Sequence, residues 1–164
     1  MVAIATISTY RGPVGTKWLN GEEMAAWRSF IETSGDLMRA IERDLQPFDL
    51  DRGDYQLLAM LSEAPDRRLR MCDLASTLRL TRSGLTRRME GVVRKKLVNR
   101  VQSTEDRREA FAQLTPKGME LLRKAAPVHL RSVRRLMIDL MSPTEIRAMA
   151  SAFSKIAHGL ERPE

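Results

Sequence analysis

Cysteine and histidine are scarce in this sequence of 164 residues, which contains one cysteine and two histidines. A single cysteine can form neither an internal disulfide nor a thiolate cluster for structural zinc, so the sequence is typical of a reducing compartment, and we expect the cytoplasm. The sequence also lacks a glycine-rich phosphate loop, metal-ligand spacing and a nucleophile at a diagnostic interval from a histidine. These absences exclude the common enzyme classes, and we expect no cofactor and no metal.

Long apolar runs are absent as well. No uncharged stretch approaches the ~20 residues that a membrane-spanning helix needs, so we expect no membrane partner. The first nine residues are apolar, but they are interrupted by Thr6 and Ser8 and follow no positive charge. They make a poor signal peptide, and residues 1–17 are interpreted as a flexible N-terminal arm. At 43% hydrophobic and 30% charged residues, the rest is typical of a single globular domain.

The positive charge is concentrated in one internal block. The whole chain has a net charge of +7, whereas residues 64–108 contain 13 basic and five acidic residues and have a net charge of +8. Like charges gathered in this way repel one another unless a polyanion neutralises them, which favours a nucleic-acid-binding face. Charge alone leaves an ordinary solvated surface equally open.

Capping residues mark the expected helices. Asn20 and Glu23 form a capping box, and the apolar periodicity that follows predicts a helix that ends at Pro47. Pro127 lies inside the fifth expected helix and is expected to kink or divide it. The further helices are predicted over residues 51–64, 71–78, 81–96, 115–141 and 142–160.

After Lys96 the pattern becomes alternating, which predicts strands over residues 98–102 and 109–115 around a charged tip. Two short helices followed by a charged hairpin are the order of a winged helix-turn-helix, so the expected fold is mainly α, with residues 51–115 as the DNA-binding region. The second helix would then lie in the major groove, and Arg87 is our first candidate for a guanine contact. The candidate DNA-binding residues of this helix are Arg82, Ser83, Thr86, Arg87, Arg88, Arg94 and Lys95.

The run from Asp106, Arg107 and Arg108 to Leu-Thr-x-x-Gly at residues 114–118 resembles the signature of the MarR family of bacterial transcriptional regulators. The resemblance extends over about residues 18–160. It implies a homodimer in which residues 18–50 and 116–164 form the dimerisation region. It also implies that Arg108 enters the minor groove, that Arg107 contacts phosphate and that Asp106 braces the wing.

Two positions depart from the family pattern. Arg79 and Lys96 occupy sites where members commonly have glycine, one between the two helices and one after the recognition helix. Glycine adopts a positive φ at little cost, so either these turns differ or the two residues are strained.

The expected dimer depends on the terminal helices, whose apolar residues recur at near-heptad spacing. The alternative is that these helices pack only on their own core. Between the dimerisation region and the DNA-binding region, the resemblance implies a cleft for a small amphipathic or aromatic effector, with Trp27, Phe30, Tyr55 and His129 as candidates. For His129 itself, the role of a satisfied interface histidine is favoured over that of a ligand or metal contact. Cys72 lies in the helix-turn-helix, whereas the sensor cysteine of peroxide-sensing members lies in the first helix.

The sequence therefore predicts a transcriptional regulator, most simply a repressor, that binds a pseudo-palindromic operator in double-stranded DNA as a homodimer. A second hypothesis remains open. A basic architectural module could coat nucleic acid, or bind an acidic partner, without reading sequence. Competition between a promoter fragment and random DNA separates the two.

Overall fold

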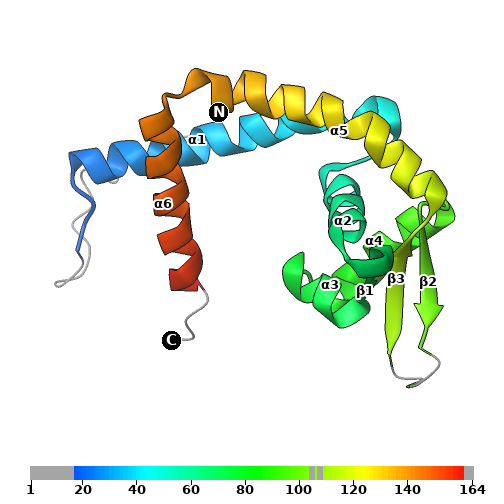
Figure 1. The fold of residues 1–164 in the computed structure, drawn as a ribbon. Helices are drawn as coiled ribbons and strands as arrows, with labels where there is room; N and C mark the ends of the chain where they lie inside the picture. The colour runs from blue at the N-terminus through cyan, green and yellow to red at the C-terminus, as the bar shows by residue number, and fades with distance from the viewer. Residues whose placement is uncertain (1–16, 104–105, 107–108, 161–164) are drawn as a thin grey trace. The chain divides into compact units, whose positions relative to one another are not determined.

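The computed structural model describes residues 17–103, 106 and 109–160, which form two compact units divided after Asp36. The expected arm over residues 1–17 lies outside the described residues except for Lys17. Figure 1 shows the order of the elements along the chain.

The first helix, α1 (Gly21–Arg43), begins at the predicted capping box. The backbone N–H of Asn20 donates to Glu23 Oε2 at 2.8 Å, and the N–H of Glu23 donates to Asn20 Oδ1 at 2.9 Å. The helix ends earlier than predicted, because Pro47 lies within a separate 3-10 turn, η2 (Gln46–Phe48). Asp49 follows in the left-handed conformation and turns the chain toward the next helix.

Three helices form the compact module of the second unit: α2 (Arg52–Glu63), α3 (Met71–Thr77) and α4 (Arg82–Arg94). Two of the predicted N-caps are confirmed. Asp51 accepts from the N–H of Asp54 at 2.7 Å, and Thr81 accepts from the N–H of Gly84 at 3.1 Å. Each cap satisfies an amide that has no partner within its own helix.

The predicted hairpin is confirmed as β2 (Val98–Gln102) and β3 (Ala110–Leu114). A third strand, β1 (Arg68–Arg70), follows the short turn η3 (Pro65–Arg67) and was not predicted. The sheet is antiparallel in the order β1-β3-β2, and Leu69 lies opposite Ala112. The strand β1 therefore joins the wing to the start of α3.

The fifth helix, α5 (Pro116–Leu136), begins at the predicted cap Thr115 and continues without a break through Pro127. Of the two outcomes predicted for this proline, the division is wrong, and the kink stays a prediction. Pro127 is exposed, and buried residues on both sides, Ala125 and Ser132, hold the helix against the core. The turn η4 (Ile138–Leu140) precedes α6 (Pro143–Leu160), which begins at the predicted capping box of Ser142 and Glu145. No described helix is long and apolar enough to span a membrane.

The core lies where α2, α3, α4 and the sheet meet α5. The predicted contacts between α3 and α4 are confirmed, because Leu74, Leu85, Met89 and Val92 are buried in one cluster with leucines of α2. Burial of one such side chain is worth about 1.5–3 kcal/mol. The core thus fixes the packing of α3 and α4, with the other side of α4 facing outward. The buried leucines of this cluster are Leu45, Leu50, Leu57, Leu58, Leu61, Leu74, Leu85, Leu97, Leu114 and Leu122.

Candidate nucleic-acid interface

The outer face of α4 carries most of the candidate DNA-binding residues. Each residue advances a helix by about 100°, so the side that is opposite the buried Leu85, Met89 and Val92 must face solvent. A shallow hollow on this side is lined by Thr81, Arg82, Ser83, Thr86, Arg87 and Glu90. Glu90 was not among the predicted site residues, although its spacing of four from Thr86 puts it on the same face.

The arginines of this face keep their donors available. Within the described part of the chain, no hydrogen bond or ion pair engages the side chains of Arg82, Arg87 or Arg94. The small polar residues are partly engaged, since the Thr86 hydroxyl donates to the carbonyl of Arg82 at 2.9 Å. Ser83 Oγ lies 3.1 Å from the Thr81 hydroxyl. The face therefore presents free guanidinium groups around hydroxyl groups of short reach, which suits a polyanion.

Arg88 and Lys95, also predicted to bind DNA, have partners inside the protein. Arg88 Nη1 lies 2.5 Å from Asp51 Oδ1 and 2.9 Å from Asp54 Oδ1. Burial lowers the pKa of Arg88, but the hydrogen bonds and charges of the two aspartates outweigh it and raise the pKa overall. Lys95 Nζ donates to the carbonyl of Asp49 and lies 3.4 Å from Asp54 Oδ2. These contacts argue against direct DNA contacts by the two residues.

The wing is attached to the helices by a bridge that the sequence did not predict. Arg70 Nη1, at the end of β1, lies 3.1 Å from Glu109 Oε1 at the base of the wing. The predicted tip residues Arg107 and Arg108 lie outside the described residues. The N–H of Asp106 donates to the Ser103 hydroxyl at 3.2 Å, and the predicted bracing role of the Asp106 carboxylate stays a prediction.

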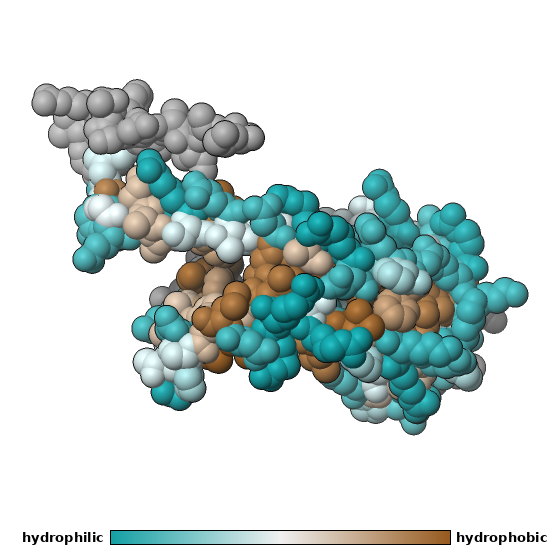
Figure 2. Space-filling view, turned by 90° about the horizontal axis from the view of Figure 1, so that it is seen from above, coloured by the Kyte–Doolittle hydropathy of each residue, from teal (hydrophilic) through white to brown (hydrophobic). Residues whose placement is uncertain are grey.

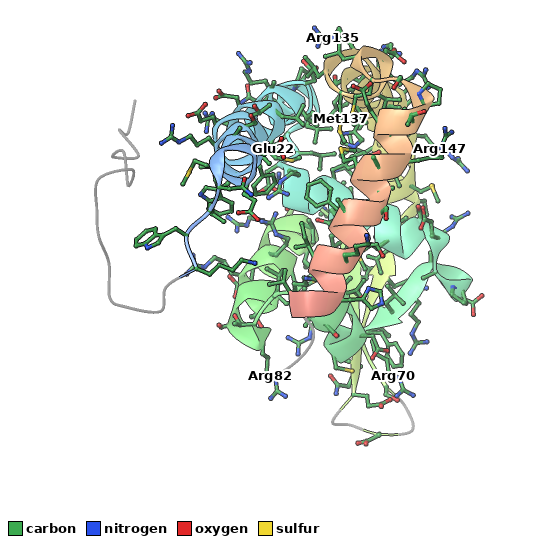
Figure 3. The ribbon with its side chains drawn as sticks, turned by 90° about the vertical axis from the view of Figure 1, so that its left-hand side faces the viewer. Glu22, Arg70, Arg82, Arg135, Met137 and Arg147 are labelled. Atoms are coloured by element: carbon green, nitrogen blue, oxygen red, sulfur yellow. The ribbon has the colours of Figure 1, made fainter. Side chains whose placement is uncertain are left out.

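A second hollow, of about 510 Å³, lies between α3, α4 and the wing. Arg70, Arg82 and Arg100 line it, with Glu109 as the acidic counterpart of Arg70. In Figure 3 the side chains of Arg70 and Arg82 point outward at the same end of the unit. The basic residues of the helices and of the wing thus share one surface. Arg70 was missed because the strand β1 was not predicted. Arg100 was missed because strand alternation alone does not tell which side of a short wing faces the helices.

Arg79 and Lys96 adopt the left-handed conformation that glycine would favour, with φ of 52° and 61°. Each closes a Schellman motif. After α3, the N–H of Leu80 donates to the carbonyl of Ala75, and after α4 the N–H of Leu97 donates to the carbonyl of Val92. Of the two possibilities for these positions, the structure shows that the turns are kept and the residues bear the strain.

The Leu-Thr-x-x-Gly segment anchors the end of α4 to the start of α5. The Thr115 hydroxyl lies within hydrogen-bond distance of the carbonyls of Lys96 at 2.9 Å and Leu97 at 3.0 Å, and it accepts from the N–H of Gly118 at 2.9 Å. A Cβ atom at Gly118 would lie 2.2 Å from the Leu97 carbonyl oxygen, so only glycine allows this approach.

Comparison with known proteins agrees with this arrangement. A family model described as MarR family matches residues 48–109. The uncharacterized HTH-type transcriptional regulator YhbI of Bacillus subtilis is 30% identical over 123 residues, which cover 74% of this chain and 79% of that protein. The crystal structure of AbsC, a MarR family transcriptional regulator from Streptomyces coelicolor, matches with 41% sequence identity and a TM-score of 0.85. The match covers 88% of this chain and 98% of the AbsC chain. The chain belongs to the MarR family.

A further MarR family regulator from Streptomyces coelicolor, Sco3205, was crystallised in complex with DNA. It is 35% identical, covers 91% of this chain and 94% of its own, and has a TM-score of 0.87. The present MarR-family chain is accordingly a DNA-binding transcriptional regulator with a winged helix-turn-helix, and not an enzyme. The face of α4 described above is its candidate DNA-reading surface.

Two of the four predicted effector-cleft residues come together in this MarR-family chain. The rings of Tyr55 on α2 and His129 on α5 have centroids 4.2 Å apart and are tilted by 39°. Burial lowers the pKa of His129 and raises that of Tyr55. His129 Nδ1 is buried and has no hydrogen-bond partner among the residues that the structure describes. Trp27 and Phe30 belong to the other unit, where their ring centroids are 6.3 Å apart on α1.

The terminal helices expose large apolar side chains, which contribute to the brown areas of Figure 2. The helix α6 has no buried residue, and Phe153 and Ile156 of its apolar stripe are 46% and 55% exposed.

Cys72 is exposed, with its Sγ 3.5 Å from Asp73 Oδ1. No group of three or more potential metal ligands occurs among the residues that the structure describes.

Proposed function

We propose that this MarR-family regulator binds a pseudo-palindromic operator as a homodimer in the cytoplasm and acts there as a repressor. The observation that carries the proposal is the exposed face of α4, where the guanidinium groups of Arg82, Arg87 and Arg94 have no partner within the described residues. A helix of this kind fits the major groove, whose base edges present a distinguishable pattern of donors and acceptors.

The residues of this face divide by reach and chemistry. Arg87 is long enough for a bidentate contact with guanine, and Glu90 can accept from the amino group of cytosine. Ser83 and Thr86 suit phosphate oxygens or a thymine methyl group, and Arg82 and Arg94, near the ends of the helix, suit phosphates. In the wing, Arg108 enters the minor groove, Arg107 contacts phosphate and Asp106 braces the tip.

The homodimer is supported by the exposure of the terminal helices. If α6 packed only on its own core, its apolar stripe would be buried, whereas Leu160 is 72% exposed and Phe153 about half exposed. Contiguous apolar surface of this kind marks an interaction site, and a second copy offers the same surface in return. Residues 18–50 and 116–164 form the proposed dimerisation region.

The effector is a small amphipathic or aromatic molecule, and the observation in its favour is the Tyr55–His129 pair. A buried ring nitrogen without a hydrogen-bond partner, next to an aromatic ring, can bind a polar group on an aromatic ligand. The predicted roles of Trp27 and Phe30, which belong to the other unit, stay predictions. Such a ligand would release DNA by favouring a dimer state with a different spacing of the two α4 helices. His129→Ala should then lose the ligand response while keeping DNA affinity.

The test compares two arginines of one helix. Arg87→Ala should cost ~1–3 kcal/mol on the preferred sequence and relax its preference, whereas Arg94→Ala should weaken binding to all sequences alike and reduce the salt slope by about one. Competition between promoter and random duplexes at physiological salt provides the ratio. Identical behaviour of the two variants contradicts these roles, and equal affinity of the wild type for all sequences supports the architectural alternative. A lone protomer in analytical ultracentrifugation contradicts the dimer.

A further inference from the structure

We propose that Asp54 and Arg88 are positioning residues for sequence-specific DNA binding, because they belong to an ion-pair network that sets the orientation of the recognition helix α4. The network, here called the α2–α4 clamp, consists of Asp49, Asp51, Asp54, Arg88 and Lys95. The inference deepens the proposed function and rests on it.

Asp54 is the centre of the clamp. Its side chain is only 10% exposed, and both carboxylate oxygens are engaged: Oδ1 with Arg88 at 2.9 Å and Oδ2 with Lys95 at 3.4 Å. Arg88 and Lys95 are seven residues apart and therefore on one side of the helix, about 10 Å apart along its axis. One buried carboxylate that holds a rigid helix at two points along its axis restricts its rotation more than a single contact would.

The other members of the clamp tie it to the start of α2. Asp51 caps α2 through the N–H of Asp54 and also accepts from Arg88. The Arg88 guanidinium lies directly over Gly53, where a Cβ atom would be 2.4 Å from its Cζ. Lys95 Nζ donates to the backbone carbonyl of Asp49 and lies 3.3 Å from Asp49 Oδ2. The arginine is thus seated on the first turn of α2.

The clamp fixes the rotation of α4 about its axis, which the apolar core contacts do not. Leu85, Met89 and Val92 hold α4 against the core through apolar contacts, which are non-directional. Charge-assisted hydrogen bonds are directional. Arg87 is the residue before Arg88 on the same helix, so a rotation of α4 at Arg88 moves Arg87 relative to the base edges by the same angle. Base contacts need exact placement, whereas nonspecific binding is electrostatic and independent of sequence.

If the clamp orients α4, a substitution of Asp54 should change the affinity for the preferred duplex in the direction opposite to that expected from charge alone. Asp54→Asn removes a negative charge from a DNA-binding module, so charge alone would strengthen binding to every duplex. If the clamp orients α4, the same change should weaken binding to the preferred duplex at least fivefold and leave binding to random duplex unchanged or slightly tighter. Glu63→Gln is the matched control. It removes one negative charge from the same helix, at an exposed residue that has no described partner.

The probe is a duplex enriched from a random-sequence pool by the full-length wild-type protein, with unselected duplex of the same length as the reference. The specificity ratio is the affinity for the selected duplex divided by that for the unselected duplex. It should fall by a similar factor in Asp54→Asn, in Arg88→Met and in their double variant, because each breaks the same contact. Glu63→Gln should keep the full ratio. Thermal unfolding of each variant provides the check on folding. If Asp54→Asn does not fold, Arg88→Met carries the test, since methionine keeps the apolar stem of the partly exposed arginine.

The outcomes separate the two levels of the proposal. Failure of the wild-type protein to enrich any duplex overturns the proposed function, and with it the inference. If the wild type enriches a duplex and the folded Asp54→Asn and Arg88→Met variants keep the full ratio, the clamp is refuted while the function stands. Equal losses on selected and random duplexes also refute it, because they indicate a general defect rather than a changed orientation of α4.

Discussion

The left-handed conformation of Lys96, at the end of the recognition helix, leads to a testable prediction about the stability of the protein. Lys96 has a φ of 61°. This conformation costs a residue with a side chain about 1–2 kcal/mol, whereas glycine adopts it freely. Glycine loses more backbone entropy on folding, which costs about 0.5–1 kcal/mol. Lys96→Gly should therefore stabilise the protein by about 0.5–1 kcal/mol, or about 1–4 °C in Tm for a chain of this length.

Two neighbouring substitutions isolate the cause. Lys96→Ala removes the same charge and side chain but keeps the strain, so its stability should stay close to that of the wild type. Arg94→Gly, two residues earlier at the last residue of α4, puts glycine where φ is helical, and should destabilise by up to about 1 kcal/mol. The same replacement is thus expected to have opposite signs at positions 94 and 96.

The assay is thermal and urea unfolding at one fixed protomer concentration, because the stability of a dimer depends on concentration. The reasoning is refuted if Lys96→Gly lowers the Tm while Arg94→Gly lowers it by a similar amount. It is also refuted if Lys96→Ala stabilises as much as Lys96→Gly, because the gain would then come from loss of the charge rather than from relief of backbone strain.

Three other variants test packing, protonation and the wing. Gly118→Ala should destabilise by about 1–3 kcal/mol in urea unfolding, because its Cβ would clash with the Leu97 carbonyl; wild-type stability would contradict that close approach. Burial lowers the pKa of His129, so the unfolded chain binds more protons, and stability should fall as pH decreases through about 6.5. His129→Gln should show a smaller loss between pH 7.5 and 5.5, and identical profiles would rule the cause out. Glu109→Gln should cost less than about 1 kcal/mol, because its bridge to Arg70 is partly exposed. It should nevertheless weaken DNA binding, measured by fluorescence anisotropy, because the bridge holds the base of the wing against β1. Loss of the negative charge alone would strengthen binding, so tighter binding would contradict this role.

The parts of the fold that were predicted correctly depend on interactions between residues close in sequence. The capping boxes at Asn20 and Ser142 each join residues three apart, and Thr115 caps α5 through Gly118, also three residues on. Such contacts do not depend on the tertiary fold, so they can be predicted from the local sequence. The positive φ of Lys96 was one of the two possibilities that the family pattern left open, and the structure selects it.

The strand β1 could not be found in this way. Its three residues, Arg68–Arg70, are too short for an alternating pattern, and two of them are charged. They become a strand only because β3 lies alongside, with Gln113 opposite Arg68 and Phe111 opposite Arg70. The partner strand is more than 40 residues away in the sequence, and no local propensity specifies it. The Arg70–Glu109 bridge was missed for this reason, since it depends on that pairing.

Arg87 and Arg88 show that a count of basic residues does not predict which of them face DNA. Both were predicted to bind DNA, and their difference follows from one helical step of about 100°. That step leaves Arg87 exposed and directs Arg88 onto Asp51 and Asp54, which are 37 and 34 residues earlier. The sequence does show three aspartates around the start of α2, but the contact between this turn and α4 is made by the fold. A basic residue on a recognition helix is therefore a candidate reader only after the carboxylates packed against that helix are known. In this chain those carboxylates engage two of the seven candidates on α4, Arg88 and Lys95, inside the protein.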